Sequence, residues 1–373
     1  MNVKKILHIT FDMNIAGTEQ VIRQIIENTD TEKFLPIVLC IDGTIGPLGK
    51  KLVDSGVEVL LLSRKPGLDF KLIRDITDIL IEQSIDIVHC HQYTPYIYGL
   101  FAALRCKTRV IFTEHGRFYP DERKWKRIIC NPILSLFTHA VTAISSATAD
   151  SLVKIENFPR KKVQVIYNGI NDVAKLDVDI AQLLEQLKIP KGHTVLGTIS
   201  RLDPIKNQEM MLKAFKNVLA ENPNTTLLII GDGPIRDKLE ELSRSLCIEQ
   251  NVIFTGFQVD PQRYLKIMDV FLLSSLSEGT SMTLLEAMAF SKPSVVTAVG
   301  GNPEIVTDRV QALLTKNEDT EAFSQAIIEL LNNSPLRNSL GEAARERYEN
   351  IFTVDKMSES YEELYVRILP TKG

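Results

Sequence analysis

Two series of short apolar runs, separated by helical patterns, constrain the fold of this chain more strongly than any other feature. The first series consists of Lys5–Thr10, Leu35–Ile41, Val57–Leu62, Ile85–Cys90, Arg109–Thr113, Ala140–Ile144 and Val163–Tyr167. The second series consists of Val195–Ile199, Thr226–Ile230, Val252–Thr255, Val270–Ser274 and Ser294–Ala298. Regular alternation of apolar strands with helices is typical of a doubly wound parallel sheet. The two series therefore predict two Rossmann-like α/β domains.

A polar stretch between the two series predicts the domain boundary. Residues 171–192 interrupt the alternation and contain one short helical pattern, Ile180–Leu187. We expect an N-terminal domain over residues 1–170, a linker over residues 171–192 and a C-terminal domain over residues 193–353. Further helical patterns follow late in the chain, at Glu321–Asn332, Leu336–Glu349 and Val354–Leu369.

Composition limits the class of protein. Of the 373 residues, 44% are hydrophobic and 24% are charged, as in an ordinary globular protein. The net charge of −4 predicts no general affinity for nucleic acid. The chain begins directly with a strand pattern and has no apolar run long enough to span a membrane, so we expect a cytoplasmic protein. The five cysteines lack metal-binding spacing and are expected to be reduced thiols.

The segment Ser274–Glu304 carries the most informative combination of residues. Its pattern predicts the end of a strand, a polar loop, a helix with Ser281 at its N-cap, and another strand. Backbone amides at the start of such a helix, near Ser281, Met282 and Thr283, favour an anion. The segment therefore predicts a binding site for a negatively charged group.

Two glutamates lie in this segment. Glu278 lies in the loop before the helix, and Glu286 lies within the helix. A carboxylate beside an anion site is well placed to accept hydrogen bonds from sugar hydroxyls. On spacing alone, a solvated loop glutamate and an exposed helix glutamate are an equally good interpretation.

The spacing Glu278-x7-Glu286, within SEGTSMTLLEAMA and followed by GGNPEIV, resembles the signature of the retaining nucleotide-sugar glycosyltransferases of family 4. The resemblance implies the GT-B fold, an α/β architecture with two Rossmann-like, doubly wound domains facing a cleft. It also implies that a helix at about residues 354–373 completes the N-terminal domain. The resemblance covers nearly the whole chain.

The resemblance assigns the donor site to the C-terminal domain. Arg201 and Lys206, in TISRLDPIKN, would bind the donor diphosphate, since Arg offers a planar fork and Lys a point charge. Glu278 would hold hydroxyls of the donor sugar, and Glu286 would bind the ribose hydroxyls. The alternative for the two cations is a pair of solvated loop charges.

Two glycine-containing turns are further candidates for the nucleotide site. The resemblance implies that Gly231 and Gly233 lie near the nucleotide and that the base is read around Gly256–Val259. Gly17, in NIAGTE, follows the first strand and would let backbone amides approach a bound group. The fingerprint G-x-G-x-x-G is absent there, which argues against NAD or FAD. Plain turns are the alternative for these glycines.

Histidines provide the site residues expected in the N-terminal domain. His89 and His91 end one strand and share one of its faces. The resemblance implies that this strand end lines the acceptor side of the cleft. His115, in FTEHG, matches a histidine that family members place against the transferred sugar and its leaving phosphate. Without the resemblance, a lone histidine at a strand end is more often structural.

No metal or other cofactor is expected. His89 and His91 have an H-x-H spacing suited to zinc, but no carboxylate or cysteine ligand lies at a helpful spacing. Asp177-Val178-Asp179 mimics the D-x-D metal motif of the other large glycosyltransferase fold, yet it lies in the expected linker. Arg201, Lys206 and helix amides would supply the positive charge instead.

The segment Arg117–Phe137 combines basic and apolar residues around Trp125. Its basic residues are Arg117, Arg123, Lys124, Lys126 and Arg127, and its apolar residues include Ile128, Ile129, Ile133, Leu134, Leu136 and Phe137. One interpretation is a peripheral contact with anionic lipid on the inner face of the cytoplasmic membrane. The equal alternative is a solvated face over a core helix interrupted at Pro132.

The implied reaction moves a sugar from a nucleotide diphosphate sugar to an acceptor hydroxyl with retention at the anomeric carbon. The acceptor would be a sugar or a lipid-linked glycan in bacterial surface polysaccharide assembly. His115, Glu278, Arg201 and Lys206 would be the catalytic residues, chiefly by stabilising the leaving diphosphate. The sequence leaves open a nucleophilic role for Glu278. It also leaves open a nucleotide-sugar epimerase of the same fold and a non-catalytic nucleotide-sugar-binding protein.

Overall fold

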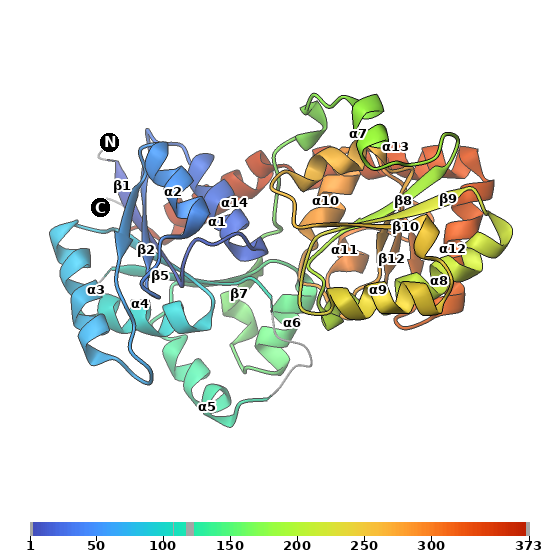
Figure 1. Cartoon of the computed structure of the whole chain (residues 1–373). Coiled ribbons are helices and arrows are strands. Elements are labelled where there is room, and N and C mark those ends of the chain that lie inside the picture. Colours follow the sequence, from blue (N-terminus) through green and yellow to red (C-terminus); the bar gives the residue numbers. More distant parts are fainter. Residues whose placement is uncertain (1–2, 107, 117–122, 371–373) are drawn as a thin grey trace. The chain divides into compact units, whose positions relative to one another are not determined.

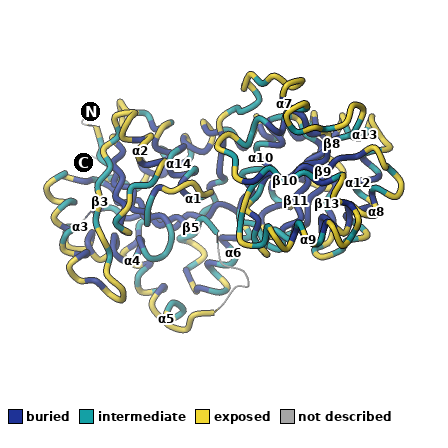
Figure 2. Tube along the Cα trace, in the orientation of Figure 1, coloured by how far each residue is buried: buried dark blue, intermediate teal, exposed yellow. Residues whose placement is uncertain are grey.

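The chain folds into two compact units. The computed structural model describes residues 3–106, 108–116 and 123–370. The first unit comprises residues up to Gly169 together with residues from Val354 onward, and the second comprises Ile170–Thr353. Each unit is built on a parallel sheet with helices on both faces (Figure 1). The strands are mostly buried, and the outer faces of the helices are exposed (Figure 2). The prediction of two Rossmann-like α/β domains is confirmed.

The sheet of the first unit has the strand order β3-β2-β1-β4-β5-β6-β7. Its strands are β1 (Lys4–Thr10), β2 (Phe34–Cys40), β3 (Glu58–Leu61), β4 (Ile87–His91), β5 (Arg109–Glu114), β6 (Ala140–Ala143) and β7 (Val163–Val165). Its helices are α1 (Gly17–Glu27), α2 (Gly46–Asp54), α3 (Phe70–Glu82), α4 (Tyr93–Cys106), α5 (Trp125–Leu134), α6 (Ser146–Lys154) and α14 (Val354–Ile368). A short 3-10 turn, Arg160–Lys162, precedes β7.

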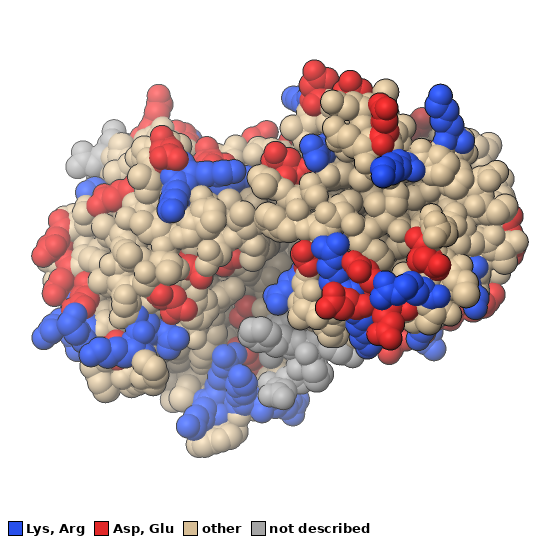
Figure 3. Space-filling model, in the orientation of Figure 1, with Lys and Arg blue, Asp and Glu red and all other residues tan. Residues whose placement is uncertain are grey.

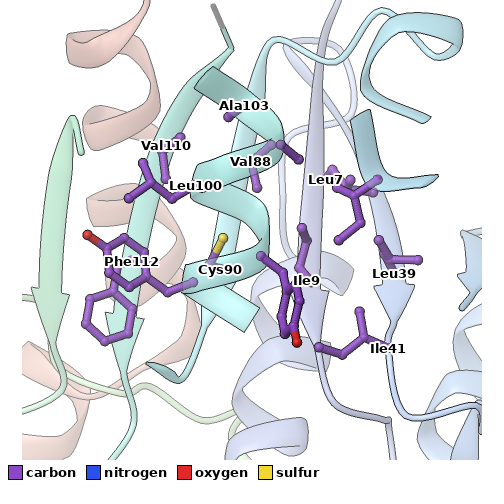
Figure 4. Close-up of a cluster of buried hydrophobic side chains, with 14 of the residues drawn as sticks. Leu7, Ile9, Leu39, Ile41, Val88, Cys90, Leu100, Ala103, Val110 and Phe112 are labelled. Carbon is purple, nitrogen blue, oxygen red and sulfur yellow. The ribbon is translucent and has the colours of Figure 1, made fainter. Parts of the chain in front are cut away.

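One face of this sheet forms an apolar core against α4. The residues drawn in Figure 4 come from the central strands and from α4; those labelled are Leu7, Ile9, Leu39, Ile41, Val88, Cys90, Leu100, Ala103, Val110 and Phe112. All of them are almost completely excluded from solvent. Burial of this apolar surface is the main stabilising contribution to the unit.

The opposite face of the same strands carries buried polar residues among apolar ones. Because successive residues of a strand point to opposite faces, the neighbours of the apolar residues lie together on the other side. They include His8 of β1, His89 and His91 of β4, and Thr113 of β5, each fully buried. Helix α14 covers this face, where the Tyr365 hydroxyl and His89 Nδ1 are 2.9 Å apart. The late helix α14 is thus part of the first unit.

The sheet of the second unit has the order β10-β9-β8-β11-β12-β13. Its strands are β8 (Thr194–Ile199), β9 (Thr225–Ile230), β10 (Val252–Gly256), β11 (Val270–Leu273), β12 (Ser294–Thr297) and β13 (Leu313–Thr315). Its α-helices are α7 (Ile180–Gln186), α8 (Gln208–Glu221), α9 (Arg236–Ser245), α10 (Met282–Ala289), α11 (Asn302–Ile305), α12 (Thr320–Asn332) and α13 (Ser334–Ile351). Its 3-10 turns are Val173–Lys175, Pro204–Lys206, Glu249–Asn251 and Pro261–Ile267.

The stretch expected to be a linker packs onto the second unit. The Arg345 guanidinium donates to both carboxylate oxygens of Asp172, each at 2.8 Å. Two parallel charge-assisted bonds of this kind fix orientation as well as distance. Helix α7 packs against the turn Pro261–Ile267, and a groove of about 450 Å³ runs between them. Residues 170–192 therefore belong to the body of the second unit.

Candidate active site

Glu278, in the loop after β11, is held by two side chains. Lys206 Nζ donates to Glu278 Oε1 at 2.7 Å, and the Ser275 hydroxyl donates to the same oxygen at 2.6 Å. The side chain of Glu278 is only 8% exposed. Glu278 is therefore not a solvated loop residue. The structure brings together the cation predicted for the diphosphate and the carboxylate predicted for the sugar.

The glycines that follow β12 fix the backbone of Glu278. The Gly301 N–H donates to the Glu278 carbonyl oxygen at 3.0 Å. Gly300 has a left-handed φ of +52°, and a Cβ there would lie 1.9 Å from the same carbonyl oxygen. At position 300, only glycine can adopt this φ and leave room for the carbonyl oxygen. The two glycines thus hold the candidate sugar-binding carboxylate in place from another loop.

Arg201 lies in the loop after β8, close in sequence to Lys206. Its side chain is 71% exposed, and its nearest carboxylate is Asp203, at the long distance of 3.8 Å. Lys206 ends the 3-10 turn Pro204–Lys206, which Asp203 caps by accepting from the Ile205 N–H at 3.2 Å. Arg201 is therefore available to an anion, whereas Lys206 is already paired within the protein.

The turn with Gly231 and Gly233 packs directly on the Arg201 loop. A Cβ at Gly231 would lie 2.0 Å from the Ser200 carbonyl oxygen, and one at Gly233 would lie 2.2 Å from that of Leu202. Both glycines are required by this close approach of backbone to backbone. Their role in the structure is to position the loop that carries Arg201, and their expected place near the nucleotide stays a prediction.

Helix α10 begins as predicted, with Ser281 at its N-cap. The Ser281 hydroxyl accepts from the Leu284 N–H at 3.3 Å. Ser281 is buried, whereas Met282 and Thr283 are partly exposed. The first amides of a helix have no acceptor within the helix. Within the described part of the chain, the N–H groups of Met282 and Thr283 therefore have no acceptor in the helix and can donate to an anion, in the direction that the helix dipole favours.

Glu286 lies in α10 with its carboxyl group withdrawn from solvent. Gln262 Nε2 donates to Oε1 at 2.9 Å, while the buried Oε2 has no partner among the described residues. Burial raises the pKa of Glu286 to about 7, and the Gln262 hydrogen bond opposes that rise. The alternative of an exposed helix glutamate is wrong. An unpaired buried acceptor costs roughly 1–3 kcal/mol, and a hydroxyl donor from a ligand would relieve that cost.

The loop after β10 presents apolar side chains. Phe257 is 60% exposed and Val259 is 73% exposed. Exposed apolar side chains beside a candidate ligand site favour contact with a planar or apolar group. The expected base contact at Gly256–Val259 is consistent with this surface but stays a prediction.

Three histidines of the first unit form a continuous hydrogen-bonded row. His115 Nε2 lies 2.8 Å from His91 Nδ1, and His91 Nε2 lies 3.0 Å from His8 Nδ1. Burial lowers the pKa of His8 and His115 to about 3 and that of His91 well below its usual value. The rings are therefore neutral at neutral pH. His115, expected beside the transferred sugar, is tied to the interior of the sheet.

His89 and His91 do not line an open surface in this structure. Both are fully buried, and His89 contacts the Tyr365 hydroxyl through Nδ1 and the Thr113 hydroxyl through Nε2, at 2.9 and 2.7 Å. Neither ring is exposed in this structure, and the expectation that this strand end lines the acceptor side of the cleft stays a prediction. His89 bridges β5 and α14.

Gly17 is the first residue of α1. A Cβ at this position would meet no atom within 4 Å, so the packing of the described chain does not require glycine. Its φ lies outside the left-handed region, so the backbone does not require glycine either. The described structure therefore gives no reason of its own for glycine here, and the expected approach of a ligand stays a prediction.

Two groups of side chains invite comparison with metal sites. Ring nitrogens of His8, His89 and His91 lie within 4.8 Å of one another. Both nitrogens of His89 and His91 are already engaged in hydrogen bonds, and no carboxylate or thiolate joins the group within the described part of the chain. Hydrogen bonding accounts for this arrangement. Asp179, of the D-x-D stretch, caps α7 by accepting from the Gln182 N–H at 3.0 Å.

Three contact residues were missed by sequence reasoning: Ser275 and Gln262 in the second unit and His8 in the first. Ser275 adjoins the strand end and Gln262 lies in a short turn, so neither has a motif of its own. The sequence did offer one indication for His8. It alternates with apolar residues in the first strand, so its side chain lies on the opposite face of the sheet from theirs. A buried histidine next to the H-x-H strand was in principle predictable.

Comparison with known proteins identifies the family. The family model described as Glycosyltransferase Family 4 matches residues 15–173, and the one described as Glycosyl transferases group 1 matches residues 179–347. The N-acetyl-alpha-D-glucosaminyl L-malate synthase of Bacillus anthracis is 28% identical over 310 residues, covering 82% of this chain and 80% of that protein. The UDP-Gal:alpha-D-GlcNAc-diphosphoundecaprenol alpha-1,3-galactosyltransferase of Escherichia coli is 26% identical over 383 residues, covering 99% and 98%.

A solved structure extends the comparison to the fold. The Anabaena protein Alr3699/HepE, in complex with UDP, superposes with a TM-score of 0.86 at 21% identity, covering 97% of this chain and 100% of that chain. The two parallel-sheet units described above are thus those of the GT-B glycosyltransferases. With matches along both units, this chain belongs to the family 4 glycosyltransferases.

Proposed function

We propose that this glycosyltransferase moves a sugar from a nucleotide diphosphate sugar to an acceptor hydroxyl with retention at the anomeric carbon. The observation that carries the proposal is the buried Glu278 carboxylate, which is paired with the Lys206 ammonium in the loop that leads directly into the first amides of α10. Such a cluster offers acceptors for sugar hydroxyls and positive charge for a diphosphate within one small region.

The diphosphate is held by Arg201 and the amides of Met282 and Thr283. Lys206 joins them by shifting part of its contact from Glu278 to a phosphate oxygen. Positive charge and amides that are already in place stabilise the charge developing on the leaving group. These groups supply that charge from the protein, and we propose that the reaction needs no metal. His115 contacts the transferred sugar, and Glu286 Oε2 accepts from a ribose hydroxyl.

Retention follows from same-face attack without an enzyme nucleophile. Glu278 Oε1 accepts two hydrogen bonds, one of them from an ammonium group, which lowers the nucleophilicity of the carboxylate. Its geometry suits a hydrogen-bond acceptor better than an attacking group. The names of both relatives describe alpha-configured sugars, which supports the proposal because nucleotide sugars with alpha linkages give alpha products by retention.

The proposed setting is assembly of a surface polysaccharide or of a lipid-linked glycan. The Escherichia coli relative acts, by its name, on a diphosphoundecaprenol-linked sugar. That name supports a lipid-linked acceptor for this chain as well. No described helix combines the length and the apolarity needed to cross a membrane.

A membrane-facing surface on the first unit fits such an acceptor. Helix α5 exposes a stripe of Trp125, Ile129 and Ile133, which are 68%, 59% and 57% exposed. Only Asn131 is buried in this helix, so the alternative of a core helix beneath a solvated face is wrong. Lys and Arg side chains gather over α5 (Figure 3). Arg117 lies outside the described residues.

The charges around α5 complement an anionic lipid surface. Arg123, Lys124 and Lys126 are exposed beside the apolar stripe, and an apolar groove of about 630 Å³ runs along α5. Arg127 is instead paired with Glu156 at 2.6 Å. We therefore propose that α5 rests on anionic lipid headgroups with Trp125 at the interface. Binding to vesicles with and without anionic lipid should separate this contact from simple apolar adsorption. The double variant Lys124→Ser/Lys126→Ser is expected to lose only the preference for anionic vesicles.

The decisive assay measures release of nucleotide diphosphate from a panel of nucleotide sugars, starting with UDP sugars, with and without lipid-linked acceptors. A transferase releases nucleotide diphosphate only in proportion to glycosylated acceptor. An epimerase yields free or epimerised sugar without acceptor, and a binding protein yields none. The anomeric proton coupling of the product tests retention. Loss of activity with a chelator, restored by manganese, would contradict the metal-free proposal.

A further inference from the structure

The two carboxylate oxygens of Glu278 have different surroundings. Oε1 accepts both a bond from Lys206 Nζ at 2.7 Å and a bond from the Ser275 hydroxyl at 2.6 Å. Oε2 accepts no hydrogen bond within the described part of the chain, and unlike Glu286 Oε2 it is not among the unpaired atoms that are closed off from solvent. The protein therefore anchors this carboxylate through Oε1 and leaves Oε2 to a donor from outside.

Ser275 can hold Oε1 firmly because its own position is fixed. It lies two positions beyond the end of β11 and is completely buried. Its carbonyl oxygen accepts from the hydroxyl of Thr297, the last residue of β12, at 2.7 Å. With the backbone held, the Ser275 hydroxyl can move only by a change of rotamer about its single side-chain torsion.

The residues on either side of Ser275 hold the backbone of Lys206. The Ser274 hydroxyl donates to the Lys206 carbonyl oxygen at 2.9 Å, and the Leu276 N–H donates to the Ile205 carbonyl oxygen at 2.7 Å. The Lys206 ammonium itself sits at the end of a flexible four-carbon stem. Its side chain is 27% exposed. Lys206 Nζ is thus the movable partner of Glu278, and the Ser275 hydroxyl is the fixed one.

We propose that Ser275 is a positioning residue that keeps Glu278 Oε1 in place while Oε2 accepts from a hydroxyl of the donor sugar. A diphosphate competes with Glu278 for the Lys206 ammonium, because both are anionic acceptors. When Lys206 turns toward a phosphate oxygen, the Ser275 hydroxyl remains and holds the carboxylate. This inference rests on the sugar-binding role proposed above for Glu278, and all of its residues lie in the second unit.

Paired affinity measurements distinguish a positioning residue from a merely structural one. The ligands for calorimetry are the UDP sugar that binds best in the panel and UDP itself, or the matching GDP or ADP pair if the panel selects another nucleotide. Ser275→Ala should weaken binding of the nucleotide sugar about tenfold, the scale of one hydrogen bond to a charged group, and leave binding of the nucleoside diphosphate unchanged. An equal loss for both ligands would mean that Ser275 supports the whole site, and would overturn the proposal.

A double variant tests whether Ser275 acts through Glu278. Glu278→Ala should weaken binding of the nucleotide sugar at least as much as Ser275→Ala does. Adding Ser275→Ala to Glu278→Ala should cause no further loss, because two residues that act through one contact are not additive. A further loss as large as that of Ser275→Ala alone would show that Ser275 acts by another route.

Ser324→Ala is the matched control. Ser324 is a completely buried serine of α12, and its hydroxyl donates to the Glu321 carbonyl oxygen at 2.8 Å. Its substitution therefore also removes one buried hydroxyl from the second unit, and it should change neither affinity. Ser275→Ala adds no atom to the structure, so it should keep the fold, which urea unfolding of both variants checks.

The outcomes also separate this inference from the proposed function. If Glu278→Ala weakens both ligands equally or weakens neither, Glu278 does not hold the sugar, and the role proposed for it fails. If Glu278→Ala weakens only the nucleotide sugar and Ser275→Ala weakens neither ligand, the positioning role is wrong and the sugar-binding role stands. If the wild type binds no nucleotide sugar, the proposed function fails, and the inference about Ser275 fails with it.

Discussion

The two units build their candidate sites from opposite kinds of chemistry. The site of the second unit is charged: Lys206 Nζ lies 2.7 Å from Glu278 Oε1, and Arg201 is exposed in the loop that leads to Lys206. The site of the first unit is polar but neutral, because burial suppresses the charge of His8, His91 and His115. Charged groups near the surface can reach out to a diphosphate and exchange partners. Neutral rings inside a sheet can only fix the orientation of the rings next to them.

The largest effect is expected from the charged site. Lys206→Met should lower kcat/KM by roughly 30- to 1,000-fold, because a group that stabilises the leaving diphosphate is lost. The loss should be measured with steady-state donor kinetics. Lys206→Met also leaves Glu278 unpaired, so the double variant Lys206→Met/Glu278→Gln should recover thermal stability but not activity. Recovery of activity by the double variant would show that Lys206 acts only as a partner of Glu278.

In the neutral site the expected loss is one of stability. Tyr365→Phe removes the hydroxyl that contacts His89 Nδ1 and should lower the free energy of unfolding by roughly 1–3 kcal/mol. Because no net charge is involved, urea titrations at low and high ionic strength should give the same loss. A strong dependence on salt would mean that His89 is charged and would break the contrast between the two units.

A smaller effect should follow from the titration of Glu286. A ribose hydroxyl pairs best with the ionised carboxylate, so affinity for a nucleotide sugar should rise about tenfold from pH 6 to pH 8 across the raised pKa of about 7. The affinity should be measured by calorimetry with a nucleotide sugar, because a free nucleotide diphosphate has a terminal phosphate that itself titrates. Glu286→Gln should give a flat profile. If the mutant keeps the same rise, another group is responsible.

The same shift predicts a stability change of known sign. The folded-state pKa of Glu286 lies above the unfolded value of 4.5, so the folded state favours the protonated carboxyl. Its stabilising contribution is complete below the unfolded pKa and is lost as pH rises through about 7. Glu286→Gln should therefore make the midpoint of urea unfolding less dependent on pH in this window. An unchanged dependence would place the titrating group elsewhere.

The smallest effect is expected at Gly17. Gly17→Ala meets no atom within 4 Å, so the free energy of unfolding should change by less than about 0.5 kcal/mol. If a ligand approaches this turn, the donor KM should rise by about threefold through the added methyl group. A donor KM equal to that of the wild type would remove Gly17 from the binding site.

Local patterns predicted most of the fold. Strand runs such as Lys5–Thr10 and Val195–Ile199 differ from the observed strands by one residue, because long apolar runs between turn residues specify buried strands. The short edge strand β13, Leu313–Thr315, was missed. The packing of residues 170–192 was also missed, since the contact of Asp172 with Arg345 spans 173 positions in the chain.

In the candidate sites too, local patterns could be predicted and contacts between distant segments could not. Glu278, Ser281 and Glu286 lie in one contiguous segment, so spacing and capping rules could predict them together. The partners of these residues could not be predicted in that way. His8 and His91 are 83 positions apart, and Gln262 and Glu286 are 24 apart. Such pairings arise from the order of strands in the sheet and from the conformation of turns, which one sequence does not encode locally.

The place of α14 in the first unit has a consequence for how the protein is made. The part of this face around His89 gains its contacts with Tyr361 and Tyr365 only after all of Ile170–Thr353 has been translated. At about 5–20 residues per second, the ribosome needs roughly 10–40 s for that interval. During this time the nascent first unit lacks the contacts that α14 makes with His89. A chaperone that protects this face would therefore act before, and compete with, the docking of α14.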